Sequence, residues 1–143
     1  MTDDDFLARL ADATLAPAEF DHAGHVRAAY LVLRREPTFG AALDRIAGLI
    51  RHFATRHGQS DKYHETITVA FMALVNARLQ GRPPVPDDAA GWPAFAAANP
   101  DLMDKTIVAG LYPGGDLSDP LSRQVFLLPG DAPRVAEKGT TAA

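Results

Sequence analysis

The chain has 143 residues, a length that fits one domain able to bury its own hydrophobic core. It contains no cysteine, which excludes disulfides, thiolate catalysis, iron–sulfur clusters and thiolate zinc sites. The net charge is −4 and no dense run of Lys or Arg occurs, so we expect no nucleic-acid partner.

The first residues, Met-Thr-Asp-Asp-Asp-Phe, are acidic, unlike the basic and then apolar start of a secretory signal peptide. No run of about 18 apolar residues occurs, so we expect no membrane partner. Together with the lack of cysteine, these features predict a cytoplasmic protein.

Apolar residues recur at helical spacing through most of the chain, and strand patterns are nearly absent. The first helix is expected over residues 2–15, with Thr2 as its N-cap. The second is expected over residues 21–35, with Asp21 as its N-cap and a proline soon after its end.

Two longer apolar stripes follow. They predict helices over residues 38–58 and 61–80, and the second of these has the widest apolar face, so we expect it to be the central helix. Shorter helices are expected over 88–97, 101–111 and 119–126. The sequence thus predicts an all-α, single-domain irregular helical bundle of about five to seven helices over residues 1–129, with a flexible tail over 130–143.

Three histidines stand out. His22 and His25 are three residues apart in the first turn of the second predicted helix, so their rings share a face that continues into the core stripe. His64 lies in the first turn of the fourth predicted helix, on the same face as Ile67 and Phe71. All three rings are therefore expected to point inward.

A helix N-terminus disfavours imidazolium, so these histidines are expected to be neutral, which is the form that binds metals. If the third helix returns antiparallel, the first turns of the second and fourth helices meet. The hypothesis is then a site with His22, His25 and His64 as ligands to a divalent transition metal (zinc, iron, copper or nickel).

Polar neighbours would complete such a site. Glu65 would be a fourth ligand or the general base, and Tyr63 would help to orient a bound water. Arg27 and Thr68 would contact the substrate, although Arg27 also fits an ordinary surface charge.

The alternatives are a metal-free polar site or purely structural histidines. Phe20 at N′ would then contact His25 at N4 as a staple, and His22 would bond a loop carbonyl. His64 would fix the loop before its helix. His52 and His57, at the end of the third helix, are expected to be solvated there, where the helix dipole favours cations.

The pattern F-x-H-x-x-H-V-R, at residues 20–27, is followed about forty residues later by Y-H-E-T-I-T, at residues 63–68. This pair of motifs resembles a group of small, mostly uncharacterised bacterial helical proteins, over residues 18–130. The later segments 99–102 and 117–118 fit the same group. The resemblance implies that the motif residues act as a set, and it implies no particular reaction.

The favoured functional prediction is a metal-dependent enzyme, a hydrolase or an oxygenase, that acts on a small molecule by activating water or dioxygen. A non-enzymatic protein that binds a metal or a small ligand is the second hypothesis. A structural or interaction protein, in which no pocket opens beside the histidines, is the third. The sequence leaves the oligomeric state open.

Overall fold

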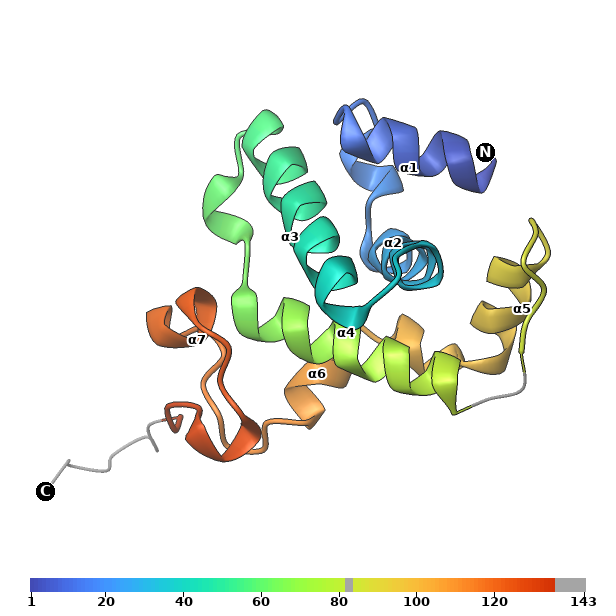
Figure 1. Cartoon of the computed structure of the whole chain (residues 1–143). Coiled ribbons are helices and arrows are strands. Elements are labelled where there is room, and N and C mark those ends of the chain that lie inside the picture. Colours follow the sequence, from blue (N-terminus) through green and yellow to red (C-terminus); the bar gives the residue numbers. More distant parts are fainter. Residues whose placement is uncertain (82–83, 136–143) are drawn as a thin grey trace, which may run out of the picture.

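The computed structural model describes residues 1–81 and 84–135, and helices dominate that part of the chain (Figure 1). Its α-helices are α1 (Asp3–Ala11), α2 (His22–Arg35), α3 (Phe39–Arg56), α4 (Glu65–Gln80), α5 (Gly91–Ala98), α6 (Ile107–Gly110) and α7 (Pro120–Gln124). Short 3₁₀ turns are η1 (Pro17–Glu19), η2 (Ser60–Lys62), η3 (Pro100–Met103) and η4 (Pro129–Asp131). The prediction of a single all-α domain is confirmed. None of the helices in these ranges is both long enough and apolar enough to cross a membrane.

Local side-chain chemistry sets where the helices begin. Four helices begin at a residue whose side chain accepts a hydrogen bond from a main-chain N–H in the first turn. These residues are Thr2, Asp21, Thr38 and Asp119. Each bond satisfies a donor that the helix itself leaves free. The predicted N-caps Thr2 and Asp21 are therefore confirmed.

Two aspartates end or divide helices that the apolar pattern would continue. Asp12 accepts hydrogen bonds from both the N–H and the hydroxyl of Thr14, so α1 ends before residue 15. Asp104 binds Thr106 in the same way, and the helix predicted over 101–111 becomes η3 followed by α6. Such side-chain bonds offer the main chain an alternative to helical pairing.

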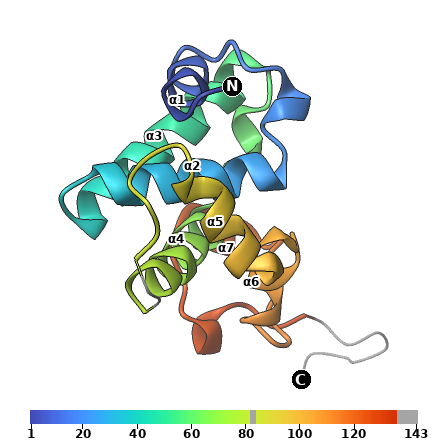
Figure 2. The ribbon, with the colours of Figure 1, turned by 90° about the vertical axis from the view of Figure 1, so that its right-hand side faces the viewer.

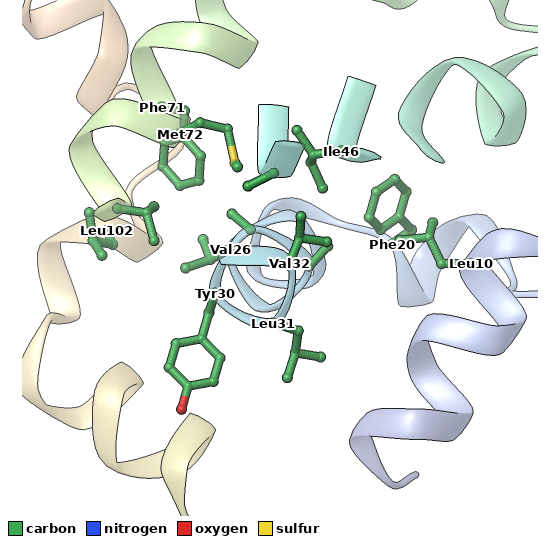
Figure 3. Packing of buried hydrophobic residues seen from close by; sticks show 14 of the residues in the cluster. Leu10, Phe20, Val26, Tyr30, Leu31, Val32, Ile46, Phe71, Met72 and Leu102 are labelled. Carbon is green, nitrogen blue, oxygen red and sulfur yellow. The ribbon is translucent and has the colours of Figure 1, made fainter. Parts of the chain in front are cut away.

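The prediction that the fourth helix is central is wrong, because α2 occupies the centre. Figure 3 looks along α2 and shows its side chains packed against residues from several other elements, including Ile46 of α3 and Met72 of α4. Figures 1 and 2 both place α1 at one end of the molecule and α4 with the C-terminal segments at the other, with α2 between them. A Cβ at Gly24 would lie 2.7 Å from the main-chain oxygen of Glu19, so the glycine lets η1 lie close against α2. Its buried residues are Gly24, Val26, Ala28, Ala29, Tyr30, Leu31 and Val32.

The last described segment packs back onto the bundle. The hydroxyl of Tyr112 donates to the carbonyl oxygen of Leu127, and the N–H of Val135 donates to the carbonyl oxygen of Gly114. Ala132 is 3% exposed. In the part of the expected flexible tail that the structure describes, residues 130–135, Ala132 is buried and Val135 is hydrogen-bonded to the segment around Gly114, while most of the other side chains are exposed. The rest of that expected tail lies outside the described residues.

Candidate functional site

A cavity of about 330 Å³ lies between α2, α3, α4 and the segment that leads into α6. Its walls are mostly apolar and include Ala29, Ile46, Ile50, Phe71, Met72 and Val108. Its polar lining consists of Asp21, His22, His25, Thr68 and Lys105. The first turn of α2 supplies three of these polar groups. The early part of α4 supplies another wall, so the first turns of the second and fourth helices do border one space.

His22 bonds across the fold to the segment after α5. Its Nε2 lies 2.8 Å from the main-chain carbonyl oxygen of Leu102. A carbonyl oxygen only accepts, so Nε2 must carry the proton, and a neutral ring then has its lone pair on Nδ1. The ring also meets Phe71 edge-on, with 5.5 Å between centroids. His22 is therefore fixed in position, and in the neutral ring Nδ1 is an acceptor with no partner among the described residues.

His25 has the opposite tautomer. Its Nδ1 lies 2.8 Å from the carbonyl oxygen of Asp21, so Nδ1 carries the proton and Nε2 holds the lone pair. The ring stacks on Phe20 with 3.9 Å between centroids, the contact expected of a staple. Burial lowers the pKa of His25 below its usual value, outweighing the hydrogen bond to Asp21 that raises it. His25 is therefore neutral at pH 7.

His64 does not line this cavity. It is 8% exposed and serves as the N-cap of α4, where its Nδ1 accepts a hydrogen bond of 3.0 Å from the N–H of Ile67. Its Nε2 donates to the carbonyl oxygen of Leu117, at 2.5 Å. Both ring nitrogens are thus in use, and α4 begins later than predicted because the His64 ring takes the capping position.

The structure does not bring the three histidines together as a ligand set. Within residues 1–81 and 84–135, no group of three or more His, Cys, Asp or Glu side chains is placed to hold a metal ion. A metal at His64 would have to displace one of the two hydrogen bonds of that ring. Two imidazoles, His22 and His25, remain at the cavity.

Glu65 and Tyr63 form a separate cluster with Arg51. The Tyr63 hydroxyl donates to Glu65 Oε2 at 3.2 Å, and Arg51 donates to the same oxygen at 3.3 Å. The guanidinium also lies 4.2 Å from the centre of the Tyr63 ring. Burial, and next the charge of Glu65, raise the pKa of Tyr63, which stays a phenol at neutral pH. Neither Glu65 nor Tyr63 lines the cavity, whereas Thr68 does.

Arg27 holds α1 against α2. Its guanidinium donates to Asp3 Oδ1 at 2.8 Å and to the carbonyl oxygen of Met1 at 3.1 Å, and it lies over the Phe6 ring. It lines a different cavity from the two histidines. Its expected contact with a substrate at the histidine site is therefore replaced by contacts with α1.

The two histidines near the C-terminal end of α3 differ from each other. His52 is exposed, as expected for a solvated helix end. His57 is half-buried, packs against Phe53 with the two rings tilted, and places Nε2 3.1 Å from the carbonyl oxygen of Ala13. The expectation of a solvated ring is wrong for His57, because the chain after α1 passes close enough for the carbonyl oxygen of Ala13 to accept a hydrogen bond from the ring.

The sequence did not indicate Lys105 or Val108 as lining residues. They come from the segment around α6, which reaches the cavity only through the tertiary fold. A single lysine between Asp104 and Thr106 has no pattern that distinguishes it from a surface charge. The bond from His22 to Leu102, which brings this segment to α2, is equally invisible to local spacing.

No protein-family model, curated protein or solved structure matches this chain.

Proposed function

We propose that this protein binds a small, largely apolar molecule in the cavity between α2, α3, α4 and α6. The observation that carries the proposal is the cavity itself, with about 330 Å³ of space, mostly apolar walls and a few polar groups gathered near the first turn of α2. Small-molecule sites commonly have volumes of roughly 300–1,000 Å³ and this kind of lining. Burial of apolar ligand surface would supply most of the binding free energy.

The structural interpretation of the histidines explains only part of the arrangement. It predicted that each ring would bond the main chain, and each ring does. It also predicted that no pocket would open beside them. His22 and His25 instead line the cavity, each with one nitrogen that has no hydrogen-bond partner among the described residues. Ligand binding accounts for both features.

Metal-dependent catalysis remains a prediction from the sequence. The cavity would offer a metal His22 and His25, while His64 is committed to capping α4. Metal analysis of the purified protein and of the His64→Ala variant tests it. Stoichiometric metal that is lost in His64→Ala would restore the three-histidine hypothesis. Metal content that does not depend on His64 would reject it.

A neutral probe, 1-ethyl-4-fluorobenzene, tests the binding proposal by NMR titration of the ¹⁵N-labelled full chain. We expect saturable shift changes concentrated at the cavity walls. In Thr68→Trp, a large ring at the half-buried wall should weaken binding roughly ten-fold or more. The matched control, Ala73→Trp, places the same ring on the exposed side of α4 and should leave affinity unchanged.

Val108→Phe, a second filling variant, covers the case in which Thr68→Trp fails to fold. The proposal is rejected if the probe causes no saturable shifts up to its solubility limit. It is also rejected if folded filling variants bind the probe as tightly as the unsubstituted chain does.

A further inference from the structure

Resting on the proposed function, we propose that the ligand of this cavity carries a hydroxyl group, an alcohol or a phenol, that donates a hydrogen bond to the imidazole of His25 or His22. The apolar part of the ligand would contact the walls formed by α3 and α4. The hydroxyl would lie at the polar end of the cavity, near the first turn of α2.

The acceptor character of this end follows from main-chain bonds. His22 Nε2–H donates a hydrogen bond to the carbonyl oxygen of Leu102, and His25 Nδ1–H donates one to the carbonyl oxygen of Asp21. In neutral rings, the nitrogens left over, His22 Nδ1 and His25 Nε2, are both acceptors. Neither has a partner in the parts of the chain that the structure describes. A ligand with a hydrogen-bond donor would satisfy them.

Asp21 also favours a ligand that donates a hydrogen bond. Its Oδ1 accepts the capping hydrogen bond from the N–H of Gly24, and an ionised carboxylate has no proton to donate. The three polar groups that α2 contributes to the cavity therefore offer acceptors to a ligand. A ligand carboxylate at this end would face acceptors and a second negative charge.

A neutral donor fits better than a charged one. The walls are mostly apolar, and burial of a charge against them is costly without a close counter-ion. The ammonium of Lys105, an exposed residue that lines the same cavity, would repel a cationic ligand. Because this ammonium is exposed and hydrated, it offers a ligand carboxylate only a weak counter-charge. A hydroxyl group supplies the donor without a charge.

The tautomers are tested first, on the unsubstituted full chain, by long-range ¹H–¹⁵N spectra of the imidazole rings at pH 7. The expected result is a proton on Nε2 of His22 and on Nδ1 of His25. The same tautomer in both rings, or a doubly protonated ring at either position, would overturn the inference. This measurement does not depend on any variant folding.

Three probes of similar shape then separate the ligand classes: 4-ethylphenol, 1-ethyl-4-fluorobenzene and 4-ethylbenzoate. One added hydrogen bond should make 4-ethylphenol bind about three- to ten-fold more tightly than the fluoro analogue. The benzoate should bind the most weakly. If the phenol and the fluoro compound bind equally, or if the benzoate binds best, the hydroxyl inference fails while the binding proposal stands. If none of the three binds, both fail.

Variants locate the acceptor. His25→Phe keeps an aromatic ring to stack on Phe20 but removes the acceptor nitrogen. His22→Phe likewise keeps an aromatic ring, beside Phe71, and removes the acceptor nitrogen at that position. We expect one of them to abolish the preference for the phenol while the fluoro analogue still binds. The control is His52→Phe, at an exposed histidine of α3 outside the cavity, which should retain the preference. Retention of the full preference in both cavity variants would overturn the inference.

Discussion

His22 and Leu102 are joined by a hydrogen bond of 2.8 Å between Nε2 of the imidazole and the main-chain carbonyl oxygen, across 80 positions of the chain. The bond holds η3 against the first turn of α2, which brings the segment leading into α6 toward the cavity. It also decides which nitrogen of His22 carries the proton. One contact thus shapes both the fold and the chemistry of the candidate site.

Loss of that bond should destabilise the protein. In His22→Phe the carbonyl group of Leu102 loses its partner, and we expect the free energy of unfolding to fall by about 1–3 kcal/mol. Urea unfolding followed by circular dichroism measures the change. His52→Phe, at an exposed position, should stay within about 0.5 kcal/mol of the unsubstituted protein. Equal stability of the two variants would show that the bond to Leu102 contributes little.

Thr66 is expected to anchor the segment after α7. Its hydroxyl is fully buried, donates to the carbonyl oxygen of Val125 and accepts from the N–H of Leu127. Thr66→Val removes both bonds at nearly constant volume. Urea unfolding should show that the free energy of unfolding falls by about 1–3 kcal/mol. Thr66→Ser keeps the hydroxyl and should lose clearly less. The anchoring role is contradicted if the serine variant is the less stable of the two.

His64 is expected to stabilise the protein by capping the N-terminus of α4. His64→Ala removes the cap of Ile67 N–H and the bond to Leu117, and should cost about 1–3 kcal/mol. Asn is a good N-cap, so His64→Asn should recover part of that loss. Chemical denaturation of the two variants checks the order. An alanine variant as stable as the asparagine variant would mean that the cap is unimportant.

The stability of the protein should depend on pH through His25. Its folded-state pKa lies below 6.5, so between that pKa and 6.5 the unfolded chain binds more protons than the folded chain. Stability is therefore full above pH 6.5 and falls as pH drops toward the folded pKa. The groups that act on its charge are Asp21, which favours it, and His22, which opposes it, and Lys105 lines the same cavity.

Urea unfolding above and below pH 6.5 measures this dependence. His25→Phe should remove the part of the stability loss below pH 6.5 that comes from His25. His52→Phe should still show that loss. The carboxylates of Asp12, Asp104 and Asp116 have lowered pKa values because they accept hydrogen bonds from nearby residues, so their contribution is lost only at more acid pH, below 3.8. An unchanged pH profile in His25→Phe would contradict the assignment.

Much of the fold could be predicted because its determinants are local. Helix starts followed from caps such as Asp21, and helix faces followed from apolar spacing. The division of the helix over 101–111 could not be predicted from spacing, because the bond from Asp104 to Thr106 competes with an apolar pattern that continues through it. The central place of α2 was not predicted, because several of its buried residues, such as Gly24 and Ala28, are small and add little to an apolar stripe.

The candidate site was predicted in part. Helical periodicity predicted that His22 and His25 point inward, and both line the cavity. It could not show that His64 would be an N-cap, because that depended on where α4 begins. Nor could it show that the carbonyl oxygen of Leu117, far along the chain, would accept a hydrogen bond from His64 Nε2. The tautomers of the cavity histidines likewise depend on the fold, since the partner of His22 is a distant main-chain oxygen.

The surface offers a competing apolar region, which makes the location of a bound ligand the decisive question. Side chains of the C-terminal part of the described chain, among them Leu121, Phe126 and Leu128, are exposed. A weak apolar probe would bind there without entering the cavity.

The most direct measurement is therefore a set of intermolecular NOEs between 4-ethylphenol and the full chain with labelled methyl groups. Ligand binding in the cavity predicts NOEs from the ethyl and ring protons to methyl groups of Ile46, Met72 and Val108. NOEs confined to Leu121 and Leu128, with none at the cavity walls, would contradict the proposed binding site.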